Sequence, residues 1–202
     1  MDFIKRVGVA NLISSFRVAL GFVVVALVGF LPDVVAAYWW AFGLTIAVIW
    51  LDGLDGYVAR KLGEASKLGA LVDIWGDRIV EMTYWIAFAT WQWVPIWVPI
   101  VVMSRGILVD GLRAVAQEQG FTAFGAQSMM QSKIGILLVS SRFSRWTYAV
   151  AKAIAFALMI LVKLPDASFI SLFSLAMACV YITVVFCVLR GLPVVAEAKR
   201  LI

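Results

Sequence analysis

Four aspartates that lie close together in the sequence offer the clearest chemistry in this chain. Asp52 and Asp55 are three residues apart, and Asp73 and Asp77 are four apart. On helices both spacings place the two carboxylates on one face. Only a short loop separates the two pairs, so the two faces can converge. Carboxylates gathered in a partly dry site repel one another, and we expect them to be stable as anions only when cations hold them together.

The type of ligand indicates which cations these would be. Ligation by oxygen alone favours Mg²⁺ or Mn²⁺ over zinc. Two such ions about 4 Å apart form a clamp suited to displacement at phosphorus. The chain contains no histidine, which excludes an imidazole base and a histidine-bound metal. The sequence therefore predicts two Mg²⁺ or Mn²⁺ ions held by Asp52, Asp55, Asp73 and Asp77.

Small residues accompany the acids. Gly56 follows the first pair and Gly69 precedes the second, although glycine costs a helix up to about 1 kcal/mol relative to alanine. Glycine allows the backbone to approach a ligand closely. Ala59, one turn from Gly56, extends this flat surface, and Arg60 can contact a diphosphate. The alternative, solvated loop acids paired with neighbouring basic side chains, does not explain four acids with this glycine spacing, and intramembrane acids are usually functional.

The composition indicates the elements that must position these residues. Of the 202 residues, 64% are hydrophobic and only 14% are charged, with a mean hydropathy of +1.00. Such a chain cannot cover a water-facing surface, and its length accommodates about six spans of roughly 20 residues. We predict an all-α integral membrane protein with six transmembrane helices. Residues 1–10 are expected to form a short amphipathic helix on the membrane surface, and residues 11–202 the membrane domain.

The apolar runs define the expected spans. The second span should continue as a polar helix through Arg60, and a short helix is expected between residues 113 and 145. The pair Lys5 and Arg6 precedes the first run, but no small-residue cleavage site follows, so this run is expected to be a retained helix. The predicted spans are residues 11–31, 34–51, 69–90, 95–112, 146–162 and 167–189.

The loops predict an orientation. One side carries twelve basic residues and the other only Lys163, a strong positive-inside signal. We therefore expect both termini and the acid cluster on the cytosolic side, in the inner membrane of a bacterium. The net charge of +5 reflects these loops rather than binding of nucleic acid. The basic residues on the cytosolic side are Lys5, Arg6, Arg60, Lys61, Lys67, Arg113, Lys133, Arg142, Arg145, Arg190, Lys199 and Arg200.

The acids and small residues together resemble a family signature. At all eight positions the pattern is similar to that of the CDP-alcohol phosphatidyltransferases. The resemblance implies transfer of a phosphatidyl group from CDP-diacylglycerol or a related CDP-lipid to an alcohol, with release of CMP, in a homodimer. It also implies that the first three acids hold metal, and that the fourth contacts metal and removes the proton of the acceptor hydroxyl. The CDP-lipid would be bound by Asp52, Gly56, Ala59, Arg60 and Gly69. The pattern reads Asp52-x2-Asp55-Gly56-x2-Ala59-Arg60-x8-Gly69-x3-Asp73-x3-Asp77.

Residues outside this signature bear on the acceptor alcohol. Asn11-x2-Ser14-x2-Arg17 resembles the opening motif of phosphatidylglycerophosphate synthases, and Ser104-Arg105 with Gly111-Leu112-Arg113 resembles their fourth-span motif. Basic side chains can bind a phosphorylated alcohol, here sn-glycerol 3-phosphate. Alternatively, some of them extend to the interface and contact anionic headgroups. The predicted acceptor-binding residues are Arg105, Arg113, Lys133 and Arg142.

Two alternatives remain open. Glycerophosphate synthases usually have glutamate where this chain has Gly106, and inositol phosphate also needs a basic pocket. The chain would then be a phosphatidylinositol-phosphate synthase. A transporter of ions or protons that uses the buried acids is the second alternative. It is disfavoured because the acids gather at one end of two spans and no internal repeat is visible.

Overall fold

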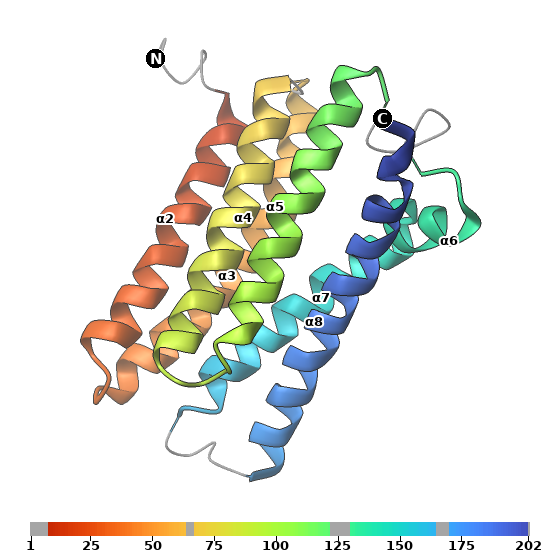
Figure 1. Cartoon of the computed structure of the whole chain (residues 1–202). Coiled ribbons are helices and arrows are strands. Elements are labelled where there is room, and N and C mark those ends of the chain that lie inside the picture. The colour runs from red at the N-terminus through yellow and green to blue at the C-terminus, as the bar shows by residue number, and fades with distance from the viewer. Residues whose placement is uncertain (1–7, 64–66, 122–129, 165–169, 202) are drawn as a thin grey trace. The chain divides into compact units, whose positions relative to one another are not determined.

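The computed structural model describes residues 8–63, 67–121, 130–164 and 170–201 (Figure 1). Every regular element in these residues is a helix, which confirms the predicted all-α class. The predicted amphipathic segment 1–10 lies mostly outside the described residues. The long helices are α2 (Val9–Phe30), α3 (Val35–Leu62), α4 (Lys67–Thr90), α5 (Trp97–Glu118), α7 (Arg142–Leu161) and α8 (Ile170–Glu197).

Four helices are long and apolar enough to cross a membrane. They are α2, α3, residues Phe143–Leu161 of α7 and residues Ser171–Glu197 of α8. Helices α4 and α5 occupy the positions of the other two predicted spans, but charged residues such as Asp73 and Arg105 lower their hydropathy. The chain is therefore a membrane protein with four clear candidate spans within its described part.

Three helix boundaries differ from the prediction by four residues or more. Helix α5 continues six residues beyond Leu112, to Glu118, and α7 begins at Arg142 rather than at Trp146. Helix α8 continues past Pro193 to Glu197. The prediction ended each helix where the apolar run ends. Backbone hydrogen bonding does not require apolar side chains, and a proline inside a helix removes only one donor.

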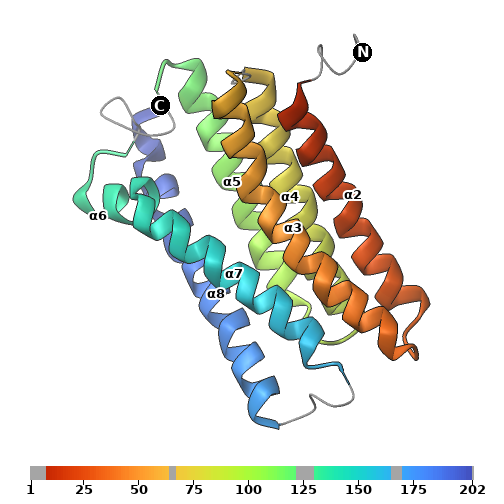
Figure 2. The ribbon, with the colours of Figure 1, turned by 180° about the vertical axis from the view of Figure 1, so that it is seen from behind.

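One compact unit comprises residues 1–93 and 156–173. Within it α2, α3 and α4 run side by side (Figures 1 and 2). Tyr84 and Trp85 of α4 are almost fully buried against Phe156, with ring centroids 4.8 and 4.9 Å apart. The hydroxyls of Tyr84 and Thr45 are hydrogen bonded at 2.9 Å, which ties α4 to α3. These contacts fix the two helices that carry the four aspartates.

The end of α3 brings its acids close in sequence to those of α4. Gly63 has a positive φ of 65°, a conformation that glycine adopts at little cost. Its N–H is bonded to the carbonyl of Ala59, which closes the last turn. Helix α4 begins four residues later, at Lys67. The carboxyl end of α3 and the amino end of α4 therefore lie at the same end of the helix pair, and both carry aspartates.

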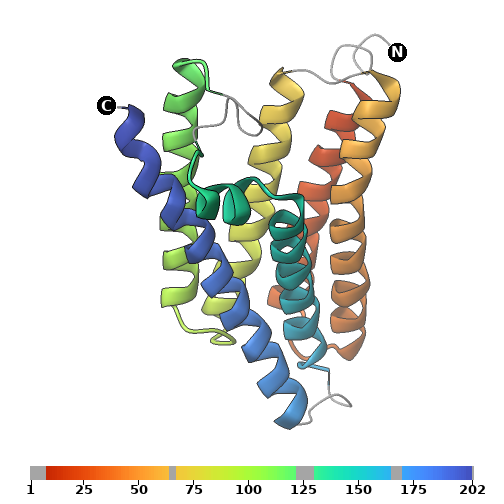
Figure 3. The same ribbon diagram turned by 90° about the vertical axis from the view of Figure 1, so that its right-hand side faces the viewer.

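The second compact unit comprises residues 94–155 and 174–202. Its core contains Val109, Ala116, Met130, Val139 and Val194. Two short turns, α6 (Lys133–Gly135) and the π-helical η1 (Ile136–Ser140), lie beside α8 (Figure 3). The carboxylate of Glu197 accepts bonds from the N–H groups of Gln131 and Ser132 and from the Ser132 hydroxyl. The end of α8 thereby fixes the segment that carries Lys133.

Candidate active site

Three of the four aspartates present oxygens to one another. One carboxylate oxygen each from Asp52, Asp73 and Asp77 lies within 4.8 Å of the other two. Their side chains are 45%, 50% and 47% exposed, so a soluble ligand can reach them. Carboxylate oxygens at this spacing are the ligands that Mg²⁺ and Mn²⁺ prefer, and these residues fit a divalent cation.

The fourth aspartate, Asp55, is held differently. It is only 3% exposed, and its Oδ2 accepts a hydrogen bond of 2.8 Å from the Ser14 hydroxyl of α2. Its Oδ1 accepts from the backbone N–H of Gly56 at 2.6 Å. The structure thus places Asp55 behind the other three acids, with part of its bonding capacity already satisfied by the protein.

Arg17 of α2 lies among all four acids. Its Nη1 contacts Asp52 Oδ1 and lies 2.8 Å from Asp77 Oδ1. Its Nη2 lies 3.7 Å from Asp73 Oδ1 and 3.9 Å from Asp55 Oδ2. The residue is 2% exposed. The sequence pattern indicated Arg17 only as part of a motif and not as a neighbour of the acids.

The motif spacing could have indicated this position. Ser14 and Arg17 are three residues apart on α2 and therefore share a helix face. In the structure both point to the acids, Ser14 to Asp55 and Arg17 to the rest. Gly76 of α4 accommodates Arg17, because a Cβ at that position would lie 3.2 Å from Nη2.

The proposed donor-binding residues lie along the end of α3 and the start of α4. A Cβ at Gly56 would lie 3.4 Å from Nη1 of Arg60, so the guanidinium lies over the glycine surface. Arg60 is exposed, and Ala59 and Gly69 are partly buried. The structure therefore brings together Gly56 and Arg60, which are four residues apart on α3.

The second unit contains a separate cluster of arginines. Arg190 is 8% exposed, its Nε donates to the carbonyl of Leu138 at 3.2 Å, and its guanidinium lies 5.2 Å from the centre of the Tyr148 ring. Electrostatic repulsion acts on it from Arg105, Arg113 and Arg145. Three further guanidinium groups within electrostatic range of Arg190 favour an anion such as a phosphate.

Two of the four predicted acceptor-binding residues belong to this cluster. Arg105 and Arg113 belong to it, and Arg105 Nε is buried without a hydrogen-bond partner among the described residues. Lys133 is exposed on α6, while the Arg142 side chain lies outside the described part of the chain. Arg190, the most buried of the four, was missed because it lies within an apolar helix and was counted only as a loop charge.

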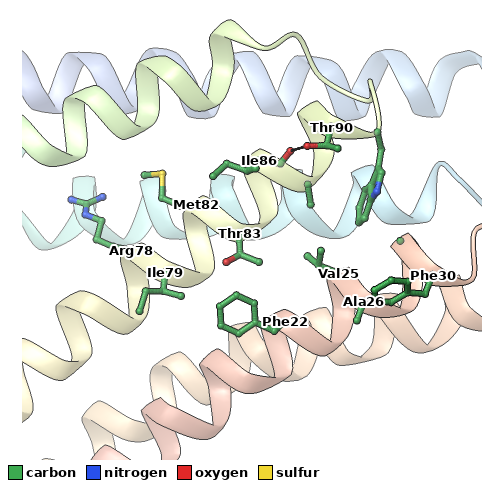
Figure 4. Close-up of a pocket in the computed structure, with 13 residues that line it drawn as sticks. Phe22, Val25, Ala26, Phe30, Arg78, Ile79, Met82, Thr83, Ile86 and Thr90 are labelled. Carbon is green, nitrogen blue, oxygen red and sulfur yellow. Dashed lines mark hydrogen bonds between the residues drawn. The ribbon is translucent and has the colours of Figure 1, made fainter.

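An apolar groove lies between α2 and α4 (Figure 4). Its volume is about 790 Å³, and its lining includes Phe22 and Phe30 of α2 with Met82 and Ile86 of α4. Arg78, the residue after Asp77, also lines it. Its guanidinium bonds Glu81 at 3.1 Å. The groove is thus a concave apolar surface that starts next to the acid cluster in the same unit.

The family model of the CDP-alcohol phosphatidyltransferases matches residues 7–189. The match covers nearly the whole chain, including both acid pairs. The chain therefore belongs to the CDP-alcohol phosphatidyltransferase family.

Individual relatives carry several different names. A Mycobacterium tuberculosis protein named "Putative cardiolipin synthase" is 32% identical over 57% of this chain and 53% of its own length. An Aeropyrum pernix archaetidylinositol phosphate synthase is 33% identical over 55% of this chain and 58% of its own. A Bacillus subtilis CDP-diacylglycerol–glycerol-3-phosphate 3-phosphatidyltransferase is 35% identical over 34% of this chain and 36% of its own. The chain spans about half the length of the first of these relatives.

Proposed function

We propose that this protein transfers a phosphatidyl group from CDP-diacylglycerol, or a related CDP-lipid, to sn-glycerol 3-phosphate and releases CMP. The convergence of Asp52, Asp73 and Asp77 at one end of the α3–α4 pair carries this proposal. Membership of the family supplies the reaction class, and relatives named as glycerol-3-phosphate phosphatidyltransferases support the acceptor.

The proposed reaction is one displacement. The acceptor's hydroxyl oxygen attacks the lipid-side phosphorus of the diphosphate. The bond from that phosphorus to the bridging oxygen breaks, and CMP leaves with the electron pair. Asp77 takes the hydroxyl proton. The chain has no histidine to activate a serine or cysteine as a nucleophile. The proposed displacement therefore proceeds without a covalent enzyme intermediate.

We place two Mg²⁺ or Mn²⁺ ions on the four aspartates. When bound, such ions neutralise the diphosphate and make CMP a better leaving group. Asp52, Asp73 and Asp77 would hold them directly, because their oxygens already converge. Asp55 would contribute through its carboxylate, whose Oδ2 accepts from Ser14 and whose Oδ1 accepts from the Gly56 N–H.

The donor is proposed to bind along the signature residues. Gly56 and Ala59 leave the end of α3 flat for the cytidine diphosphate, and Asp52, Arg60 and Gly69 border it. The apolar groove beside Arg78 offers a surface of the right chemistry for an acyl chain of the same lipid.

We propose that the phosphate of the acceptor binds at the arginine cluster. The acceptor-binding residues expected from the sequence are Arg105, Arg113, Lys133 and Arg142, and the structure adds Arg190. Inositol phosphate is the second candidate, favoured by relatives named as inositol phosphate synthases. Both are phosphomonoesters with about two negative charges near neutral pH.

The protein as a whole is proposed to have six spans, with α4 and α5 as the third and fourth. Their charged residues would then face the protein interior or the aqueous site, as intramembrane charges usually do. We further propose cytosolic termini, a cytosolic active site, a bacterial inner-membrane location and a homodimer.

A panel of acceptors tests the proposal. Detergent-solubilised protein is incubated with CDP-diacylglycerol, Mg²⁺ and, in turn, sn-glycerol 3-phosphate, inositol phosphate, inositol and serine, and the lipid product is identified. We expect product with sn-glycerol 3-phosphate. Product with inositol phosphate alone would favour the second candidate. If no CMP is released with any of the four acceptors, the result would contradict the enzyme class. Transport through the acids would then be the remaining alternative.

A further inference from the structure

The position of Arg17 raises a question that the proposed metal site leaves open. A divalent cation bound by Asp52, Asp73 and Asp77 would meet a guanidinium already bonded to two of them. The guanidinium of Arg17 lies within 4 Å of four carboxylates. The arginine thus occupies a position where positive charge is strongly favoured, and it does so without leaving the protein.

The bonding of Arg17 is incomplete. Its Nη1 serves Asp52 and Asp77, but its Nε and Nη2 are buried and have no hydrogen-bond partner within the part of the chain described by the structure. A buried donor left without a partner is costly, so a merely structural arginine would be expected to have its donors satisfied. Incomplete bonding suits a side chain that changes partners.

Space around the side chain also allows such a change. Gly76 leaves room for Nη2 on the α4 side, since a Cβ there would lie only 3.2 Å away. Asp52, Asp73 and Asp77 are about half exposed, so the guanidinium head can move with them toward solvent while its stem stays packed.

From these observations we propose that Arg17 is an exchangeable counterion of the acid cluster. It holds the carboxylates together before divalent cations bind, and it leaves Asp52 and Asp77 when they bind. The inference rests on the proposed metal site and deepens it. Because Nη1 occupies Asp77 Oδ1, its departure also frees the oxygen that is proposed to take the acceptor proton.

The proposal sets Arg17 in competition with the metal, which gives an unusual expectation. Removing a positive charge from the site should tighten metal binding, although it removes a contact. A divalent cation a few ångströms from a guanidinium is repelled strongly enough, even when screened, to change affinity by about tenfold or more. The same removal should destabilise the protein only when no metal is present, because four carboxylates then lose their counterion.

Mn²⁺ binding and thermal unfolding of the full-length protein in detergent test this. Purified Arg17→Met is titrated with Mn²⁺, and free Mn²⁺ is followed by electron paramagnetic resonance. We expect its Kd to fall about tenfold or more relative to wild type. In EDTA its Tm should fall by roughly 5–10 °C, and saturating Mn²⁺ should remove most of that difference.

Two further variants keep the test decisive. Arg78→Met removes a neighbouring arginine that bonds Glu81, and it should change the Kd for Mn²⁺ by less than about threefold because its site is one-quarter exposed. If Arg17→Met does not fold, Arg17→Gln removes the charge but keeps a polar side chain with donors for the carboxylates, and its Kd should still be lower than that of wild type.

The outcomes separate this inference from the proposed function. Failure of wild type to bind Mn²⁺ would overturn both. Wild-type binding with an unchanged or raised Kd in the Arg17 variants would overturn the counterion role and leave the metal site standing. An equal loss of Tm with and without Mn²⁺ would likewise show that Arg17 is only structural.

Discussion

The four aspartates have unequal surroundings, and this should give them unequal roles. Asp55 is buried and bonded to Ser14, whereas Asp77 is about half exposed. A buried carboxylate with fixed partners suits a metal ligand. Asp77 is as exposed as Asp52 and Asp73, so an incoming hydroxyl can reach it. Asp77 therefore remains the proposed base.

Replacement of Asp77 tests the proposed division of roles among the aspartates. Asp77→Asn should lower kcat by about 10²-fold or more, because an amide cannot accept the hydroxyl proton. The KM for CDP-diacylglycerol should change much less. Asp33→Asn, in the exposed turn between α2 and α3, is the matched control and should keep wild-type kinetics. Near-normal turnover of Asp77→Asn would remove this residue from the role.

The glycine surface of α3 offers a second residue-level test. Gly56→Leu should raise the KM for CDP-diacylglycerol at least tenfold, because the new side chain covers the surface and displaces Arg60, whereas leucine itself favours the helix. Gly53→Leu on the same helix points into open space and should leave this KM unchanged. Steady-state kinetics with both variants measure the difference. Equal KM values would contradict the close approach of the nucleotide.

At the scale of the elements, helix packing decides where the charged groups lie. Helices α3 and α4 contribute the four aspartates, and α2 contributes Arg17, which contacts them. In the second unit, α5 carries Arg105 and α8 carries Gly191 and Arg190. A Cβ at Gly191 would lie 2.9 Å from Cγ of Arg105, so the missing side chain allows Arg105 to lie against α8.

This close approach predicts a specific effect on the acceptor. Gly191→Ala should displace Arg105 and raise the KM for the phosphorylated acceptor by about 10–100-fold, the loss expected for one charge-assisted bond of 1.5–3 kcal/mol. Gly111→Ala on α5 meets no neighbouring atom and serves as the control. The KM for CDP-diacylglycerol should stay constant in both. A raised donor KM in Gly191→Ala would instead indicate general damage to the fold.

The sequence predicted elements better than contacts between them. Residue spacing was enough to place Asp52, Asp73 and Asp77 together, because both pairs lie on helix faces at the ends of one short loop. It was not enough to place Arg17 or Arg190, because their partners lie on other helices and depend on packing. Helix ends such as Glu118 were missed because hydrophobicity reports the apolar run, whereas the helix continues wherever backbone bonds are made.

For the molecule as a whole, the uneven charge of the loops is the feature with the largest consequence. Twelve basic residues are expected on one side and Lys163 alone on the other. Both proposed substrates carry phosphate, and the proposed donor is a nucleotide-linked lipid. A cytosolic site would give the enzyme access to both of them and to Mg²⁺.

Labelling with a membrane-impermeant thiol reagent tests this orientation. In a protein whose Cys179 and Cys187 are replaced by serine, a single cysteine at Lys61 should react only in inverted membrane vesicles. A single cysteine at Lys163 should react only in intact cells, because positively charged loops stay on the cytosolic side. The opposite pattern would reverse the proposed topology.

The most direct test of the central claim is CMP release from CDP-diacylglycerol by purified protein with sn-glycerol 3-phosphate. The proposed metal-dependent transferase predicts release in Mg²⁺, no release in excess EDTA, and recovery when Mg²⁺ or Mn²⁺ is added back. Asp73→Asn should release little CMP under all three conditions, because it loses one of the three converging oxygens. Undiminished CMP release in EDTA would contradict the account, since the acid cluster would then have no metal to hold.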